Sequence, residues 1–149
     1  MRTIQSRTDS PEFFNRWSLS SIVLFAVNNA YLKLQFTSWF TGKLSDVLLC
    51  FFLPLFISSC INLVADIPVR SRLLAGCVIT AIIFTSVKIS EFASHYLNVV
   101  LTYISLLLGF GKSLNIADKS DLIALPMIIV AYYVGNYHAR IGRNEESNK

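Results

Sequence analysis

Four long apolar runs constrain this chain more than any other feature of its sequence. They cover residues 17–35, 46–65, 73–89 and 122–138, and an α-helix of about 17 to 25 residues crosses the hydrocarbon core of a bilayer. A soluble domain of 149 residues would expose too much surface for a chain that is 54% hydrophobic and 15% charged. The sequence therefore predicts an all-α fold, a multi-pass transmembrane helical bundle with four spans.

A fifth apolar stretch, residues 92–111, has three alternative placements: a span, a re-entrant segment or an interfacial helix. The positions of the arginines decide between them, because cytoplasmic loops are enriched in Lys and Arg. With four spans and a cytoplasmic N-terminus, every arginine is cytoplasmic: Arg2, Arg7, Arg16, Arg70, Arg72, Arg140 and Arg143. A fifth crossing would move the last two outside, so we expect an external re-entrant or interfacial helix.

This topology divides the chain into three parts. Residues 1–16 form a cytoplasmic N-terminal segment, residues 17–138 the transmembrane bundle, and residues 139–149 a cytoplasmic tail. We expect the polar residues 143–149 of this tail to be disordered. The first span lacks a small-residue cleavage site, so it is predicted to be an uncleaved signal anchor. Both termini are then cytoplasmic.

The residues that usually carry chemistry form no enzyme motif and no metal site. The net charge of +4 follows from the arginines beside the spans, so nucleic acid is not an expected partner. Cys50, Cys60 and Cys77 lie in apolar runs without metal-ligand spacing and are predicted to be small buried hydrophobes. His95 and His138 fall on opposite sides of the membrane. We expect no enzymatic activity, no cofactor and no metal.

The two halves of the chain share a pattern that suggests a duplicated helical hairpin. In each half a span ends at a lysine, Lys33 or Lys88, and the next span begins at a Ser-Asp pair, at residues 45–46 or 120–121. Each returning span also contains a proline. Because both halves run in the same direction, the implied symmetry axis lies along the membrane normal.

The repeat gathers polar side chains at the external ends of the helices. Polar groups at such a depth tend to face the bundle and pair, because facing lipid is costly. We therefore expect one polar cluster at the outer mouth, which is the candidate site of this chain. Its predicted members are Asn28, Asn29, Lys33, Lys43, Ser45, Asp46, Lys88, Asp118 and Asp121.

Two interpretations of this cluster are open. The Ser-Asp pairs at residues 45–46 and 120–121 can cap the helices that they open, while Lys33 and Lys88 extend to the interface. Alternatively, the lysines and carboxylates pair with one another or bind a solute or a partner.

The last span carries a small-residue step, Ala131 and Gly135, that lets another helix approach closely. Packing within the same chain is the favoured interpretation of this step, because most small-residue faces pack within their own bundle. A seam between two copies of the chain is the alternative.

Four short motifs of the sequence resemble those of a group of small bacterial membrane proteins. They are V-N-N-A-Y-L-K at 27–33, T-G-K-L-S-D at 41–46, V-K at 87–88 and D-K-S-D-L-I-A-L-P at 118–126. The group carries N-D-x-x-L-K, T-G-K-L-S-D, V-K and D-P-T-D-L-x-A-L in the same order. The resemblance implies a four-span protein of the bacterial inner membrane and no particular activity. This chain has Asn29 where the group tends to have Asp, and Lys119-Ser120 where it has Pro-Thr.

Three functions remain as hypotheses, and a membrane enzyme is the third and least favoured of them. The first is a membrane-embedded interaction or accessory protein, whose partner is another membrane protein or a second copy of the chain within the lipid bilayer. The second is a small oligomeric channel or transporter with its polar site at the outer mouth. The residues Cys50, Ser58, Ser59 and Asn62 would continue a polar track below Asp46. Transport paths usually carry an ionisable group near the midplane of the membrane. The predicted spans carry no charge below the interface, so the interaction protein is favoured.

Overall fold

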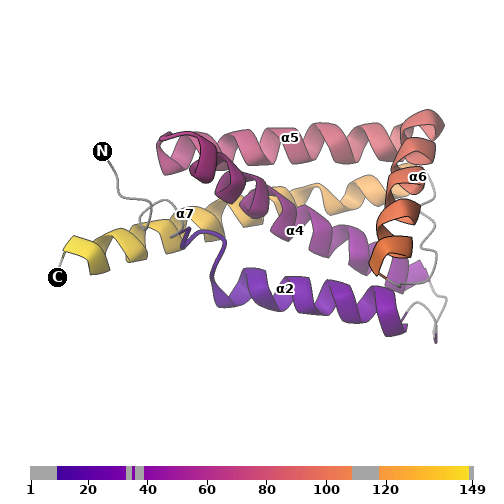
Figure 1. Cartoon of the computed structure of the whole chain (residues 1–149), viewed down its shortest axis with the longest axis horizontal. Coiled ribbons are helices and arrows are strands. Elements are labelled where there is room, and N and C mark those ends of the chain that lie inside the picture. The colour runs from indigo at the N-terminus through magenta and orange to yellow at the C-terminus, as the bar shows by residue number, and fades with distance from the viewer. Residues whose placement is uncertain (1–9, 33–34, 36–38, 109–117, 148–149) are drawn as a thin grey trace.

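Helices make up the computed structural model of this chain, which describes residues 10–32, 35, 39–108 and 118–147 (Figure 1). These residues contain no strand, so the all-α prediction is confirmed. In chain order the elements are α2 (Arg16–Val27), the π-helical turn η1 (Asn28–Leu32), α4 (Trp39–Val64), α5 (Val69–Ile89), α6 (Glu91–Leu108), the 3-10 helix η2 (Lys119–Ala124) and α7 (Pro126–Ser147).

Three helical stretches are long and apolar enough to cross a membrane: Phe40–Val64, Val69–Ile89 and Lys119–Gly142. They correspond to the second, third and fourth predicted spans. The first predicted span comprises α2, which has 12 residues, followed by η1. Neither α2 nor η1 belongs to these three membrane-length stretches, so a fourth span stays a prediction.

The helix α4 lies at the centre of the bundle. It packs against α2 on one side and against α5 and α7 on the other, and α5 and α7 also pack together. Two apolar clusters fill the space between α4, α5 and α7. One contains Cys50, Phe84, Ala124 and Ile128, and the other contains Phe51, Leu55, Leu73 and Ala131.

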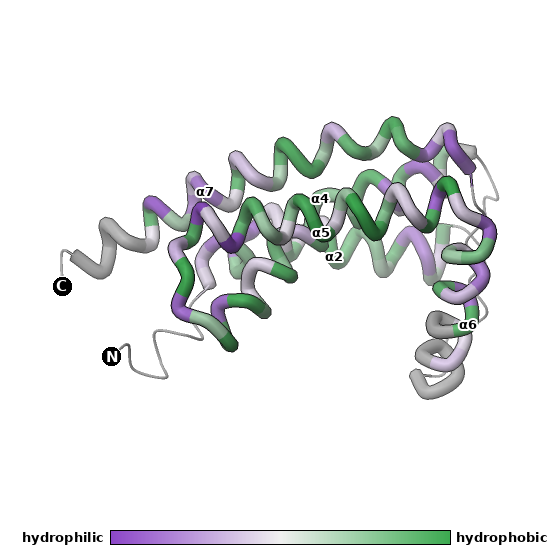
Figure 2. The backbone as a smooth tube through the Cα atoms, turned by 90° about the horizontal axis from the view of Figure 1, so that it is seen from above, coloured by the Kyte–Doolittle hydropathy of each residue, from purple (hydrophilic) through white to green (hydrophobic). Residues whose placement is uncertain are grey.

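The surface of the bundle is apolar and its interior is unusually polar. Large hydrophobic side chains face outward, among them Phe56, Ile82 and Ile129, and buried polar residues outnumber buried hydrophobic ones in the described part of the chain. Figure 2 shows hydrophobic residues along the middle of the long helices and hydrophilic residues toward their ends. Water disfavours such a distribution, whereas a lipid-facing bundle requires it.

Helices α4 and α5 run antiparallel and meet along one stripe on each helix. Three pairs of residues mark this contact along its length. The facing pairs are Asp46 with Lys88, Pro54 with Gly76, and Asn62 with Arg72. A Cβ at Gly76 would collide with the backbone carbonyl of Pro54, so glycine is what allows the two helices to approach there.

The helix α6 lies crosswise over one end of the bundle in both views (Figures 1 and 2). Ser90 ends α5 with an extended backbone, φ −101° and ψ 118°, and its hydroxyl caps α6 by accepting the N–H of Ala93 at 3.3 Å. Phe92 and Tyr96 on α6 are exposed. The helix covers most of the predicted interfacial stretch, whose residues 109–111 lie outside the described part, and its relation to a membrane stays a prediction.

Several predicted boundaries differ from the structure. The helix α4 begins at Trp39 rather than at residue 46, and α5 begins at Val69 rather than at residue 73. Residues 143–149 were expected to be disordered, but α7 continues to Ser147. Apolarity marks the part of a helix that suits lipid, whereas the helix itself can continue through the polar residues beyond it. Pro126 is the first residue of α7, a position that proline favours.

The prediction that all three cysteines are buried is wrong for one of them. Cys50 is fully buried, Cys77 is half-buried, and Cys60 is exposed on α4. Position 60 lies outside the stripe of α4 that faces α5, which explains the difference.

Candidate functional site

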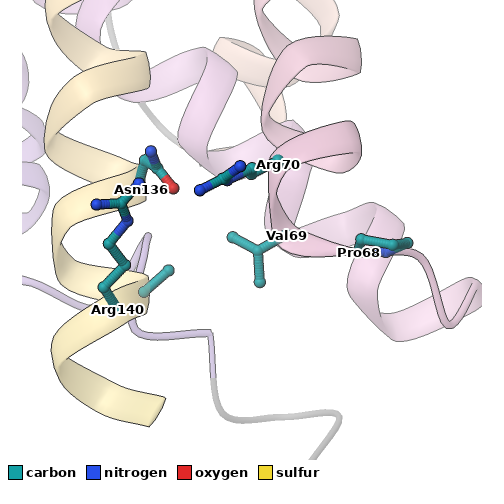
Figure 3. Close-up of a pocket in the computed structure, with 6 residues that line it drawn as sticks. Pro68, Val69, Arg70, Asn136 and Arg140 are labelled. Atoms are coloured by element: carbon teal, nitrogen blue, oxygen red, sulfur yellow. The ribbon is translucent and has the colours of Figure 1, made fainter. Parts of the chain in front are cut away.

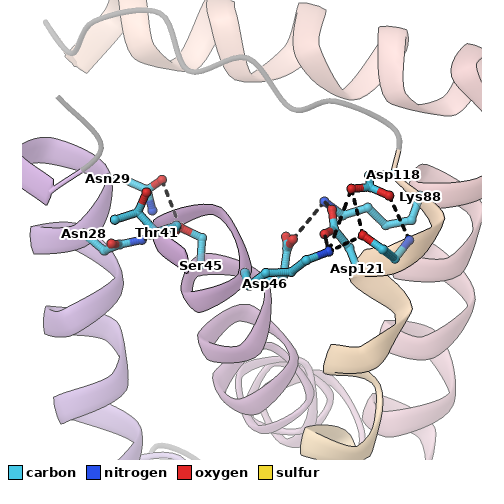
Figure 4. Close-up of polar contacts among 10 residues, drawn as sticks. Asn28, Asn29, Thr41, Ser45, Asp46, Lys88, Asp118 and Asp121 are labelled. Atoms are coloured by element: carbon cyan, nitrogen blue, oxygen red, sulfur yellow. Dashed lines mark hydrogen bonds and ion pairs between the residues drawn. The ribbon is translucent and has the colours of Figure 1, made fainter. Parts of the chain in front are cut away.

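Four charged side chains form a buried ion cluster where α4, α5 and η2 meet (Figure 4). Its members are Lys43, Asp46, Lys88 and Asp121. The Nζ of Lys88 lies 3.0 Å from Oδ2 of Asp46 and 2.6 Å from Oδ2 of Asp121. Lys43 pairs with Oδ1 of the same Asp121. No side chain of the cluster is more than 13% exposed, and its two positive and two negative charges balance.

Asp118 and Ser120 lie at the exposed rim of the ion cluster. The carboxylate of Asp118 accepts the backbone N–H and the hydroxyl of Ser120, each at 2.8 Å, and Oδ2 lies 3.8 Å from Nζ of Lys43. The two hydrogen bonds from Ser120, and then the nearby Lys43, lower the pKa of Asp118. Lys43 also donates to the hydroxyl of Ser120. Asp118 thus links the cluster to the start of η2.

A second polar group, the asparagine group, lies on the other side of the first turns of α4 (Figure 4). Asn28 donates to the carbonyl of Thr41 at 2.8 Å and to the hydroxyl of Ser45 at 2.7 Å. The hydroxyl of Ser45 lies 3.4 Å from Oδ1 of Asn29. The predicted single cluster is therefore two groups separated by α4, one holding η1 to α4 and the other holding α4, α5 and η2 together.

Asn28 also marks a change of helix type, because the π-helical turn η1 begins there. A π-helical turn inside a helix is uncommon and often lies at a functional position. Asn28 is fully buried, and its Oδ1 accepts no hydrogen bond within the described part of the chain. Lys33, a predicted member of the cluster, lies outside the described residues.

The capping interpretation is wrong for most of the residues to which it was applied. Because α4 begins at Trp39, Ser45 and Asp46 lie within the helix, where the backbone N–H groups are already bonded. At η2 the cap is Asp118, which leaves Asp121 to bind the lysines. The geometry supports the alternative interpretation, in which lysines and carboxylates pair.

A third polar group lies at the opposite end of the bundle, and sequence reasoning missed it. Glu12 pairs with Arg72 at 2.6 Å, and the two side chains are 0% and 3% exposed. Arg72 also donates to Asn62, whose amide lies 3.2 Å from the hydroxyl of Ser10. Arg72 was expected in a cytoplasmic loop, but it is in the first turn of α5. Glu12 lies before the first predicted span, where the sequence offers no periodic signal for a buried position.

The small-residue step of α7 packs within the chain. Ala131 and Gly135 are buried, and a Cβ at Gly135 would lie 2.7 Å from Cδ2 of Leu55 and 2.9 Å from Cδ2 of Leu73. These contacts come from α4 and α5, so the favoured interpretation of the step is confirmed.

No family model, curated protein or solved structure matches the chain. The resemblance to a group of small bacterial membrane proteins therefore stays a prediction. Within the residues that the structure describes, no three His, Cys, Asp or Glu side chains are grouped so as to hold a metal ion.

Proposed function

We propose that this chain is a multi-pass protein of the bacterial inner membrane, with α2, α4, α5 and α7 as its four spans and α6 at the external surface. The apolar outer face of the bundle supports insertion in lipid. The start of α2, the connection between α4 and α5, and the end of α7 lie at one end of the bundle (Figure 1). Arg16, Arg70 and Arg140 lie in these regions, so the positive-inside rule makes that end cytoplasmic.

We further propose that the chain acts as an interaction or accessory protein, in which the ion cluster holds α4, α5 and η2 together. We call this role of the ion cluster the structural clasp. The observation that carries this proposal is the internal charge balance of the cluster. Lys88 contacts Asp46 and Asp121, and Lys43 contacts Asp121. A charged solute would have to break these buried pairs before it could bind, and an orphaned buried charge costs about 3–5 kcal/mol.

The outward face of α7 favours a protein partner. Ile129, Tyr133 and Tyr137 follow one another at four-residue spacing and are 61%, 68% and 62% exposed. Lipid tails offer no hydrogen-bond acceptor to a tyrosine hydroxyl, whereas a neighbouring helix does. This stripe is therefore the proposed contact surface for another membrane protein or for a second copy of the chain.

Photo-crosslinking tests the proposed contact surface. A photoreactive amino acid at Tyr133 or Tyr137 should give a discrete protein adduct in the native membrane. The matched control is Ile82, which is 61% exposed on the outward face of α5 and should give lipid adducts. Purification in a mild detergent then identifies the partner by mass. Equal adducts at all three positions, or none at any, would contradict this surface.

A path for a small solute is the second candidate function, and one observation favours it. Ser58 on α4 and Thr80 on α5 are fully buried, and neither hydroxyl has a hydrogen-bond partner within the described part of the chain. Both lie on the stripes along which the two helices meet, between the ion cluster and the Glu12–Arg72 pair. Buried unsatisfied hydroxyls are typical places for water. Flux into proteoliposomes that Thr80→Val abolishes would establish this function in place of the first.

A further inference from the structure

A cavity of about 190 Å³ lies between the start of α5 and the last third of α7. It is at the end of the bundle opposite the ion cluster. Figure 3 shows Arg70 of α5 and Asn136 of α7 extending toward each other across it. Arg140 lies one turn beyond Asn136 on α7. The lining residues are Pro68, Val69, Arg70, Asn136, Ala139 and Arg140.

Among the residues that the structure describes, neither guanidinium group of this cavity pairs with a carboxylate. The ion pairs formed among the described residues include Arg72 with Glu12, but they include neither Arg70 nor Arg140. Two cations from different helices that line one cavity repel each other. An anion between them would replace that repulsion by two charge-assisted hydrogen-bonded contacts.

Other groups at the cavity also favour an anion. The helix α5 has 21 residues, and no side chain caps its first turn, where Val69 and Arg70 line the cavity. The first N–H groups of a helix have no intrahelical acceptor, and the helix dipole is positive there. The described lining residues therefore supply two positive forks and a helix start, and none of them is a carboxylate.

We propose that this cavity binds a phosphate group. Arginine forks match the oxygens of a phosphate in two-point contacts, which a halide cannot make. The phosphate of an anionic phospholipid is one source, because basic pockets between helices at the cytoplasmic side suit such headgroups. Free phosphate is the other source. The phospholipid source rests on the proposed membrane orientation, whereas the free-phosphate source does not. The experiment therefore distinguishes the two sources.

The test measures the thermal midpoint of the full-length protein in a neutral detergent. Phosphatidylglycerol is titrated in one arm, inorganic phosphate in a second, and phosphatidylcholine, which has no net charge, in a third. We expect a saturable rise of the midpoint with phosphatidylglycerol or phosphate and a smaller rise with phosphatidylcholine. Arg70→Gln and Arg140→Gln should each weaken the apparent affinity about tenfold, because each removes one charged contact. Both arginines are exposed, so neither substitution disturbs the core.

The matched control is Arg16→Gln at the same end of the bundle, where the guanidinium packs over the ring of Trp17. It should bind as the wild type does. A response to phosphatidylglycerol alone identifies a lipid site, and an equal response to inorganic phosphate identifies a site for the free anion. The proposal is overturned if neither probe gives a saturable shift, or if the shifts are the same in Arg70→Gln, Arg140→Gln and Arg16→Gln. These results do not depend on the crosslinking from α7, so this site and the proposed partner surface can fail separately.

Discussion

The ammonium group of Lys88 lies 2.6 Å from the Oδ2 of Asp121, although 33 residues separate the two along the chain. This contact joins the end of α5 to the start of η2. Since the same ammonium group also contacts Asp46 of α4, one lysine connects three elements. The free energy of unfolding should therefore depend on Lys88 more than on any exposed lysine.

Removing the acid of the Glu12–Arg72 pair should destabilise the opposite end of the bundle. Glu12→Gln leaves the 3% exposed guanidinium of Arg72 without its carboxylate. We expect a loss of about 3–5 kcal/mol in the free energy of unfolding, because the remaining charge is buried. Denaturation in mixed micelles measures it. The control Glu91→Gln changes an exposed carboxylate at the start of α6, and a loss above about 1 kcal/mol there would indicate a general charge effect.

Alanine substitutions at three glycines should have three different outcomes. Gly76→Ala drives a methyl group against the backbone of Pro54, which cannot turn aside, so we expect a loss of about 1–3 kcal/mol. Gly135→Ala meets only the ends of leucine side chains and should cost less. Gly42→Ala has nothing within 4 Å and should stabilise α4 by about 0.5–1 kcal/mol. Unfolding midpoints that rank in another order would contradict the close packing of α4 on α5.

The crosswise position of α6 predicts that it does not cross the membrane. In a variant without native cysteines, single cysteines at Glu91 and Lys119 should both react with a membrane-impermeant maleimide added outside cells. The two residues flank α6 and the segment after it, and both are exposed. Labelling of one from outside and of the other only after lysis would establish an additional crossing.

The pKa of Asp118 should respond to Ser120. The hydrogen bonds from Ser120 lower the pKa of this carboxyl below its ordinary value of 3.8. A lowered pKa in the folded state adds stability above the unfolded value, and that stability is lost as the pH falls through the folded pKa. Ser120→Ala removes the hydroxyl donor but keeps the backbone N–H. We expect an NMR titration of the carboxyl carbon to show a midpoint that rises toward 3.8 without reaching it.

The class of the fold and three of its long helices were predictable, because apolar runs of bilayer length allow few alternatives. The ends of the helices were not. Polar residues and a glycine at positions 41–43 and 45 interrupt the apolar run, yet residues 39–45 extend α4 by almost two turns. This extension turns Asp46 from a cap into a member of the ion cluster. Boundaries depend on helix propensity and on tertiary contacts, which hydropathy does not report.

The composition of the ion cluster was predictable, but its pairing was not. The sequence indicated that Lys43, Asp46, Lys88 and Asp121 lie at one depth. Which lysine meets which carboxylate depends on the stripes along which α4 and α5 face each other, and on the short turn by which η2 enters α7. The Glu12–Arg72 pair was missed because an N-terminal segment before the first span gives no periodic signal from which a buried position can be inferred.

A double-mutant cycle on Lys88 and Asp121 tests the structural clasp most directly. The measured quantity is the free energy of unfolding of the wild type, Lys88→Met, Asp121→Asn and the double variant, with the exposed Lys119→Met as control. Each single change unbalances the cluster by one charge and should cost about 3–5 kcal/mol. The double variant leaves Lys43 and Asp46 as one charge of each sign, so it should lose clearly less than the sum of the two single losses. Strictly additive losses would contradict the clasp.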